Sequence, residues 1–457
     1  MSDSSYGSDD LNFENFIPRF INNEYVLLKQ IGHGGYSIVF ISYSIKKKKY
    51  YAIKIQNPSY YDDAENETKI INKLSAKNPS LFIKMVETFD LCLEDDDENI
   101  CFCFVFELMA CTVYSLIRRG KYENGLPLEI VKDILFQMIS AIKIMHDLNI
   151  IHSDIKPENI LIGGTRRSIE EIKTKFESFN FEEECRKKIV KKTLVSRQNK
   201  KATKTTIDAK KEIYDEEAEK IYKLINNLSD DSGSSFSSNE ELSSSSDSDF
   251  DRCLLSSEKS ISSNSDDSDS SDSAAKYDAL CETDETLLLT NIKVKLTDFG
   301  GSFFINKKPK HPVQTRYYKS PEMILKCDYN EKCDVWAIGC VAYELLTGDI
   351  LFDPHKKHGC NTNRIHIYEM QRTLGLIPQS MILQSKRSDV FFRSDGSQKG
   401  IYNFVPNLLI DKLNKIKDKI SEVDFQLAYD FINKTLSYEC SVRMSMDECL
   451  HHPFLKR

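Results

Sequence analysis

The chain has 457 residues, 40% of them hydrophobic, and its 70 acidic and 62 basic side chains give a formal net charge of −8. This composition supports a sizeable core, in one large two-lobed domain or in two to three average domains, and it excludes a wholly disordered chain. No apolar run approaches the roughly 20 residues of a membrane span, and the acidic, serine-rich start is unlike a signal peptide. The 13 cysteines include no Cys-x-x-Cys pair, which is typical of free thiols. We therefore expect a soluble intracellular protein, cytoplasmic and/or nuclear, that does not bind membranes.

The first quarter of the chain predicts a small β-rich unit behind an acidic tail. Residues 1–24 are assigned to this tail, because Ser and Asp dominate its beginning. Residues 64–74 carry charged and apolar side chains at helical spacing. Four segments have the alternating, β-branched or aromatic pattern of strands, and the first two flank a glycine-rich turn: 25–31, 38–43, 50–55 and 100–106.

A long helix is predicted after Pro127, because apolar side chains recur there every three to four residues. This helix leads into the string His-Ser-Asp-Ile-Lys-Pro-Glu-Asn, residues 152–159, and then into Ile-Leu-Ile. We assign residues 25–162 to one continuous part of the domain and residues 291–457 to its remainder.

Residues 163–290 form a charged, low-complexity insertion with two different halves. The first half mixes Lys and Glu at helical spacing, and its basic cluster at 186–192 is either a nuclear import signal or an exposed helix face. The second half, 229–284, is almost entirely Ser, Asp and Glu, so we expect disorder there. We interpret this acidic tract as a solvated tether or as a regulatory segment.

The chain beyond Gly300 predicts a mainly helical part. Helical spacing of apolar residues is clearest at 333–346, 365–374, 425–436 and 446–450. The expected fold class is therefore α+β, with a small β-rich lobe, a large helical lobe and a long, partly disordered insertion.

Glycines and a lysine in the β-rich part suggest a phosphate-binding site. Residues 32–37, Gly-His-Gly-Gly-Tyr-Ser, lie between two strands, where glycines let the backbone approach phosphates and Val39 can pack on a base. Taken alone, a glycine-rich hairpin is more often only a turn. Lys54 follows on a strand, where its ammonium can hold phosphates, and Glu67 is the carboxylate best placed to pair with it, with Glu65 as a competitor.

The string at 152–159 contains the residues expected to act on a hydroxyl group. Asp154 is the candidate acceptor of the substrate hydroxyl proton, and Lys156 is expected to steady the γ-phosphate. Asn159 and Asp298 are the candidate metal ligands, because Mg²⁺ prefers oxygen ligands. About 140 positions separate these two ligands, so the insertion must loop out and return, at an entropic cost that grows slowly with length.

In this order, these motifs resemble the eukaryotic protein kinases over residues 25 to about 454, apart from the insertion. The resemblance implies a bilobal kinase fold, ATP and Mg²⁺ as cofactors, and transfer of the γ-phosphate to protein Ser or Thr. Thr315–Glu322 resembles the segment that ends the activation loop, and Phe106 the gatekeeper. Asp334 and Arg443 resemble the residues that anchor the catalytic loop and pair with Glu322. The residues implied to contact ATP are Ile31, Gly32, His33, Gly34, Gly35, Tyr36, Ser37, Ile38, Val39, Ala52, Lys54, Glu107 and Met109.

Within the CMGC group of kinases, the chain is most similar to the SR-protein kinases, which phosphorylate Arg/Ser-rich proteins. That family has its insertion at the same point, has Ser at the third glycine as in Ser37, and lacks the Arg before the catalytic Asp, where this chain has Ser153. That Arg binds an activation-loop phosphate in many kinases, so we expect activity without loop phosphorylation, unless Lys310 substitutes.

The chain also departs from the SR-protein kinases. Asp349 matches one acid of their docking groove, but Ile365 and Arg372 stand where the family has two others. The partners expected are ATP and a protein substrate of Arg/Ser-rich type, with no direct nucleic acid contact, and the chain is expected to be a monomer. The alternatives are a CMGC kinase with Pro-directed or other substrates, and a pseudokinase scaffold whose acidic insertion docks basic partners.

Overall fold

The computed structural model describes residues 16–34, 36–93, 100–118, 122–198, 206–226, 289, 291–309, 314–354, 361–400 and 404–456, without the side chains of 194–198 and 206–208. The chain divides into two compact units, which are described separately below. The β-rich unit comprises residues 1–75, 83–110 and 165–236, and the helical unit comprises residues 76–82, 111–164 and 237–457. This division confirms the predicted α+β class. No helix in the described ranges is both long and apolar enough to cross a membrane.

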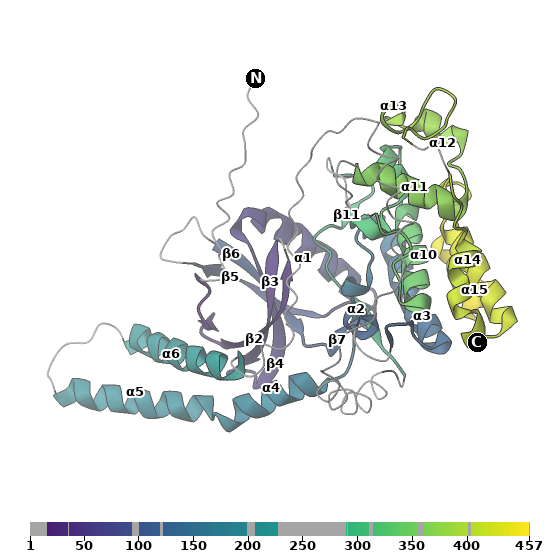
Figure 1. Ribbon diagram of the computed structural model, residues 1–457. Helices are drawn as coiled ribbons and strands as arrows, with labels where there is room; N and C mark the ends of the chain where they lie inside the picture. Colours follow the sequence, from purple (N-terminus) through teal and green to yellow (C-terminus); the bar gives the residue numbers. More distant parts are fainter. Residues whose placement is uncertain are drawn as a thin grey trace, which may run out of the picture. The chain divides into compact units, whose positions relative to one another are not determined.

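The β-rich unit is built on a six-stranded antiparallel sheet in the order β1-β2-β3-β4-β6-β5 (Figure 1). Period-two alternation buries Ile38, Phe40, Ile53 and Ile55 in one core cluster. The strands are β1 (Phe20–Ile21), β2 (Tyr25–Gly34), β3 (Ser37–Ser44), β4 (Lys49–Gln56), β5 (Met85–Cys92) and β6 (Ile100–Glu107), with η2 (Pro58–Tyr60) and α1 (Tyr61–Ser75) between β4 and β5.

Part of the insertion belongs to this unit. Its three helices are α4 (Arg167–Ser178), α5 (Phe181–Gln198) and α6 (Thr206–Asn226), and α4 and α6 contact the sheet at β2. Apolar residues spaced three to five apart bury one stripe of these helices in a cluster shared with the sheet, whose members include Val26, Leu28, Ile169, Ile172, Phe176, Phe181, Ile213, Ile221 and Ile225. The helices of residues 165–226 are therefore part of the folded β-rich unit. The tract 229–284 lies outside the described residues.

Order also begins earlier than the expected boundary at Tyr25. Phe20 and Ile21 form β1, which pairs with β2, and both side chains are buried. The ring of Phe20 stacks on Tyr214 of α6 with 4.8 Å between centroids. The residues at the start of the chain are mainly acidic and Ser, which is why the sequence alone places this short apolar segment in the tail.

Phe176 tests whether the insertion helices stabilise the sheet. Its ring is 5% exposed and lies 4.7 Å from the ring of Tyr43 on β3. Truncation of a buried Phe costs about 3–5 kcal/mol, so Phe176→Ala is expected to lower the free energy of unfolding by that amount in urea titrations followed by circular dichroism. Phe136→Ala, at a ring that is 50% exposed on another helix, is the matched control. A loss below about 1 kcal/mol for Phe176→Ala would mean that the helices are a detachable appendage.

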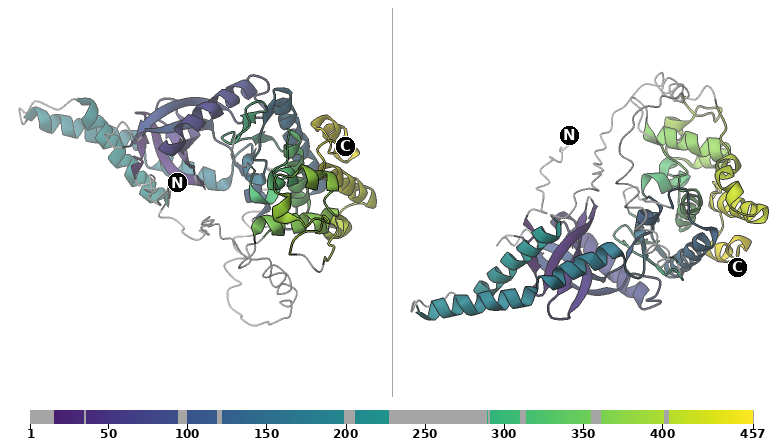
Figure 2. Two further views of the ribbon diagram at one scale, coloured as in Figure 1. Left: turned by 90° about the horizontal axis from the view of Figure 1, so that it is seen from above. Right: turned by 60° about the horizontal axis from the view of Figure 1, so that its bottom comes forward.

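The helical unit is arranged around α10 (Lys332–Thr347), every residue of which is buried except Lys332. α3 (Leu128–Asp147) and α15 (Glu422–Thr435) pack against it (Figure 2). The other helices are α2 (Val113–Ile117), α9 (Pro321–Leu325), α11 (Thr362–Leu374), α12 (Gln379–Gln384), α13 (Ser388–Phe391), α14 (Leu409–Leu413) and α16 (Met446–His451), with the 3₁₀ helices η4 (Pro157–Asn159), η6 (Arg316–Tyr318), η7 (Asn414–Lys419) and η8 (Pro453–Leu455).

Short strands of the helical unit join the two sides of the insertion. β9 (Ile160–Ile162) and β10 (Val294–Leu296) pair in antiparallel register, with Ile160 opposite Leu296. The chain thus leaves and returns at neighbouring strands, and residues 152–159 and 297–300 lie at adjacent ends of this pair. The remaining strands are β7 (Cys111–Thr112), which pairs with β9, and β8 (Ile150–Ile151), which pairs with β11 (Phe303–Phe304).

Candidate active site

A buried carboxylate anchors the loop at 152–159 through hydrogen bonds with its backbone. Asp334, on α10, accepts hydrogen bonds from the backbone N–H groups of His152 and Ser153, both at 2.9 Å. The Nε2 atom of His146 lies 2.9 Å from the same carboxylate. Ser153 has a φ of +66°, which is uncommon for a residue other than glycine, so the loop conformation depends on these contacts.

The Asp154 carboxylate lies at the centre of a polar cluster. Its Oδ2 atom is 2.6 Å from the Nζ atom of Lys156 and accepts a hydrogen bond from the Nδ2 group of Asn159 at 3.1 Å. Its Oδ1 atom accepts a hydrogen bond from the hydroxyl of Thr315 at 2.6 Å, and Lys156 donates to the same hydroxyl at 3.1 Å. The structure thus brings together three predicted residues, Asp154, Lys156 and Asn159.

The candidate metal ligands flank two neighbouring strands, since Asn159 directly precedes β9 and Asp298 follows β10. The backbone N–H of Thr297 donates to the carbonyl of Asn159 at 3.1 Å, which places Asp298 beside the loop. Asp298 has a φ of +62°, a conformation that the following buried Phe299 helps to hold, since its ring packs near those of Phe82 and His152. Among the described residues there is no group of three or more His, Cys, Asp or Glu side chains that could hold a metal ion.

The electrostatics of the loop favour a charged Lys156. Burial lowers the pKa of Lys156, but the carboxylate of Asp154, with smaller contributions from Glu158 and Asp298, raises it above its ordinary value. Burial also raises the pKa of Glu158, whose Oε2 atom is buried without a hydrogen-bond partner among the described residues. Because this oxygen has almost no accessible surface, a donor outside the chain could reach it only after neighbouring side chains move.

In the β-rich unit, the predicted lysine and glutamate pair directly. The Nζ atom of Lys54, on β4, lies 3.0 Å and 2.9 Å from the two carboxylate oxygens of Glu67 on α1. Glu67 is 1% exposed, whereas the competitor Glu65 is exposed and pairs with Lys69 on the same helix. Glu67 is therefore the carboxylate that positions Lys54.

The glycine-rich segment is the β2–β3 hairpin, in which Gly32 lies opposite Val39 and Gly34 opposite Ser37. A Cβ atom on Gly32 would lie 3.3 Å from that of Val39, so a larger residue would strain the hairpin. Tyr36, next to the undescribed Gly35, packs its ring on Tyr60 with 4.5 Å between centroids. The hairpin leaves Ile31, His33 and Tyr36 exposed.

The remaining predicted nucleotide contacts divide between the two faces of the sheet. Val39 lies opposite Lys54, and Ala52 lies opposite Phe106, with all four side chains on one face. Ile38, by contrast, is 0% exposed in the core on the opposite face, so its side chain cannot reach a ligand on the Lys54 face. Glu107 and Met109, at and beyond the end of β6, are partly exposed.

Sequence reasoning missed a second carboxylate site in the helical unit. Glu344, on α10, is 0% exposed and accepts a hydrogen bond from the hydroxyl of Tyr318 at 2.7 Å. Arg118, at the end of α2, donates to the same carboxylate and, at 2.7 Å, to the carbonyl of Gly348. A Glu within the apolar run of α10 was the only signal for this site in the sequence.

Glu344 should make the stability of the helical unit depend on pH. Burial raises its pKa to about 7 despite the hydrogen bonds from Tyr318 and Arg118. The pKa of a Glu in the unfolded chain is near 4.3, so the folded state favours the protonated carboxyl. This preference stabilises the folded state by about 3 kcal/mol. The stabilisation is complete below pH 4 and is lost as the pH rises to 7. Glu344→Gln should reduce the change in the free energy of unfolding with pH, as measured by urea titrations between pH 5 and 7.5. Glu422→Gln, at an exposed residue, should keep the wild-type slope, and an unchanged slope for Glu344→Gln would contradict the assignment.

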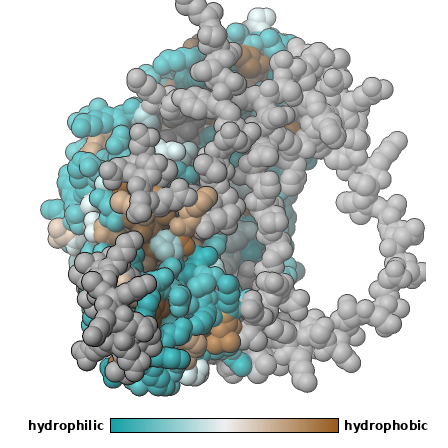
Figure 3. All heavy atoms as spheres, turned by 90° about the vertical axis from the view of Figure 1, so that its left-hand side faces the viewer, coloured by the Kyte–Doolittle hydropathy of each residue, from teal (hydrophilic) through white to brown (hydrophobic). Residues whose placement is uncertain are grey.

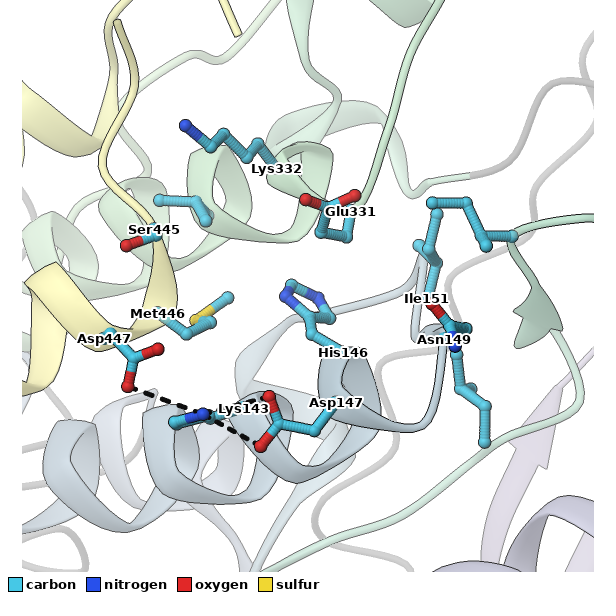
Figure 4. Close-up of a pocket in the computed structure, with 13 residues that line it drawn as sticks. Lys143, His146, Asp147, Asn149, Ile151, Glu331, Lys332, Ser445, Met446 and Asp447 are labelled. Atoms are coloured by element: carbon cyan, nitrogen blue, oxygen red, sulfur yellow. Dashed lines mark hydrogen bonds and ion pairs between the residues drawn. The ribbon is translucent and has the colours of Figure 1, made fainter. Parts of the chain in front are cut away.

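A cavity of about 270 Å³ lies elsewhere in the helical unit, between the end of α3, the start of α10 and the start of α16 (Figure 4). Lys143 lies at its edge, 2.8 Å from Asp147 and 3.4 Å from Asp447. Neither Asp154 nor Asp298 lines this cavity. It is therefore not the site at which the predicted catalytic residues gather.

Comparison with known proteins identifies the family. The protein kinase domain family matches residues 25–198 and 283–455, on both sides of the acidic tract. The chain belongs to the protein kinase family. Because the matched ranges contain Lys54, Asp154, Asn159 and Asp298, the polar clusters described above lie within the kinase domain.

Its relatives in this family are serine/threonine kinases. The chain is 30% identical to "Putative serine/threonine-protein kinase L205" of Acanthamoeba polyphaga mimivirus, over 98% of this chain and 90% of the relative. It is 26% identical to the serine/threonine-protein kinase AFC3 of Arabidopsis thaliana, over 97% and 83% of the two chains. It is 24% identical to SRSF protein kinase 3 of Homo sapiens, over 95% and 86%. The chain is a serine/threonine kinase, and the predicted similarity to the SR-protein kinases is confirmed.

Proposed function

We propose that this kinase transfers the γ-phosphate of Mg-ATP to Ser or Thr hydroxyls of protein substrates, with Asp154 as the base. The observation that carries the proposal is the 2.6 Å hydrogen bond from the Thr315 hydroxyl to Asp154 Oδ1, because it places a hydroxyl donor where a substrate hydroxyl would bind. A substrate hydroxyl in that position would have its proton accepted by Asp154, while Lys156 would hold a phosphate oxygen beside it.

The residues present suit Mg-ATP. Lys54, aimed by Glu67, would hold the α- and β-phosphates, and the Gly32–Ser37 hairpin would approach them with its backbone. Asn159 and Asp298 offer amide and carboxylate oxygens, the ligand types that Mg²⁺ prefers, and phosphate oxygens would complete its coordination. Bound Mg²⁺ would neutralise charge on the phosphates. We propose that Phe106, Glu107 and Met109 bind the adenine base of ATP.

We infer that activity does not require phosphorylation of the activation segment. The Ser153 hydroxyl donates to the carbonyl of Gly301 at 2.7 Å, so this position links two loops and offers no cation to a phosphate. The alternative receptor, Lys310, lies outside the described residues. Phosphatase-treated protein is expected to retain at least half of its turnover. Total dependence on phosphorylated Thr315 would contradict this inference.

Arg/Ser-rich proteins are the proposed substrates. The support comes from Glu158, a partly buried residue of the loop at 152–159 whose carboxylate interacts with Lys156 and, more weakly, with Arg118. A substrate guanidinium could pair with Glu158 once a side-chain movement exposes its unpartnered Oε2 atom. Asp349 offers less support for a docking groove, since Lys415 pairs with it at 2.6 Å.

The deciding experiment compares phosphate transfer to three peptide classes that each contain one Ser: Arg-rich, Ser-Pro and acidic. We expect the Arg-rich class to have the highest kcat/KM, and Glu158→Gln to reduce that preference at least fivefold without changing kcat/KM for a neutral peptide. Higher kcat/KM for Ser-Pro peptides would instead favour a Pro-directed CMGC kinase. If the protein transfers phosphate to none of the three peptide classes but binds basic partners, the pseudokinase scaffold is favoured instead.

A further inference from the structure

The insertion contains two stretches of opposite charge. Residues 186–211 hold eleven basic and one acidic side chain, a net charge of +10. Residues 229–284 hold fifteen acidic and three basic side chains, a net charge of −12, together with 21 serines. The basic stretch spans the end of α5 and the start of α6, and the acidic tract begins three residues after α6 ends.

Ion pairs join α5 and α6 at two places along this hairpin. Lys188 of α5 pairs with Glu217 of α6, and farther along the hairpin Lys192 lies 2.7 Å from Glu212. Lys191, Lys210 and Lys211 are exposed and have no ion pair within the described residues. We call these three lysines the outer basic end.

Figures 1 and 2 show α5 and α6 side by side, projecting beyond the strands of their own unit. Figure 3 views the molecule from the side toward which they project, and the coloured part of that face is mainly hydrophilic with smaller hydrophobic patches. A polyanion could therefore lie along this face without having to bury much apolar area, and the three lysines of the outer basic end are exposed.

We propose that the outer basic end binds the acidic tract 229–284 of the same chain. Opposite charges of similar size favour this pairing, and the tract is covalently attached nearby. The path along α6 from Lys210 to Asn226 is about 24 Å at 1.5 Å per residue. An extended chain covers about 3.3–3.6 Å per residue, so seven or eight residues beyond α6 suffice to return to Lys210. Attachment gives the tract an effective concentration on the order of millimolar, which a free polyanion seldom reaches.

This contact would also cover the basic cluster 186–192, which was one candidate for an import signal. In the structure this cluster is helical, and Arg186, Lys187 and Lys188 pair with glutamates. Phosphorylation of tract serines would add about −1.5 to −2 charges each and would strengthen the contact. The contact depends on charge, so salt should weaken it.

The first test is carbodiimide cross-linking of the full chain at micromolar concentration in low salt, read by mass spectrometry. Tract carboxylates are expected to link to the outer basic end at least five times more often than to three other exposed lysines, Lys69, Lys77 and Lys386. In a mixture of ¹⁴N- and ¹⁵N-labelled protein, the links should join residues of one chain. Equal linking to both lysine sets would make the tract a plain tether, and links between chains would make a second copy the occupant; either result overturns the proposal.

The second test measures how accessible the outer basic end is, with a 20-nucleotide RNA as the probe. Deletion of 229–284 is expected to raise RNA affinity at least tenfold. The triple variant K191E/K210E/K211E should lose this gain, and the matched variant K69E/K77E/K386E should keep it. Equal RNA affinity for the full and deleted chains would show that the tract does not cover the lysines. In that case a nucleic acid would replace the tract as the favoured ligand of the outer basic end.

Discussion

Asp154→Asn is expected to lower kcat for phosphate transfer by about 10²–10⁴-fold, because an amide cannot accept the hydroxyl proton. The substitution keeps the size of the side chain and one oxygen that can accept from Thr315 or Lys156, so folding should be preserved. ATP binding should change little, since the proposed phosphate-holding residues Lys54 and Glu67 lie in the β-rich unit. The measurements are steady-state kinetics on the best peptide of the three classes and nucleotide binding by calorimetry.

Asp147→Asn is the matched control for this experiment. Asp147 is a carboxylate of the same unit that lies on the surface, 60% exposed in its side chain, and among the described residues its ion pair is with Lys143. Its loss should leave kcat unchanged. Turnover of Asp154→Asn within threefold of the wild type would refute Asp154 as the base, and loss of nucleotide binding in that variant would assign it a structural role instead.

The local chemistry of the site was predictable from the sequence because each motif is short and lies at the end of one strand or helix. Lys54, Asp154, Asn159 and Asp298 are recognised from their neighbours in the chain, and the β9–β10 pairing explains how the last two approach each other across the insertion. Glu67 was preferred to Glu65 from the sequence, and the structure shows the reason, because the face of α1 that Glu67 occupies is the one that meets Lys54. Ile38 illustrates a limit of such motifs, because the strand face it occupies follows from register.

Contacts between distant segments could be predicted only where the resemblance implied them, as for Asp334 with the loop at 152–159 and Arg443 with Glu322. Thr315 meets Asp154 across 161 residues, and Arg118 meets Glu344 across 226, so neither pair leaves a local pattern. The insertion helices were read as a charged, low-complexity segment because most of their residues are polar. Their apolar stripe is narrow, and only its burial against Val26 and Leu28 reveals that residues 165–226 are part of the β-rich unit.

Arg443→Met should have the largest effect on the stability of the helical unit. The guanidinium is 1% exposed and donates to both oxygens of Glu322 at 2.7 Å and 2.9 Å. It also donates to the carbonyls of Ser437 and Lys332. Burial raises the pKa of Glu322, but Arg443 more than reverses this and holds it below its usual value. Removing the cation leaves an uncompensated buried carboxylate, at a cost of about 3–5 kcal/mol.

The double variant Arg443→Met with Glu322→Met separates this charge effect from lost packing. If the uncompensated carboxylate dominates, the double variant should be more stable than Arg443→Met alone, because no charge then remains in the core. Trp336 is the only tryptophan, is fully buried and lies 5.2 Å from the guanidinium, so its fluorescence reports unfolding of this unit in urea. Lys434→Met, which removes a surface ion pair with Asp430, should change stability by no more than about 0.5 kcal/mol. If the double variant is less stable than Arg443→Met, packing and the carbonyl hydrogen bonds matter more than the charge, and the pair acts mainly as a positioning element for α9.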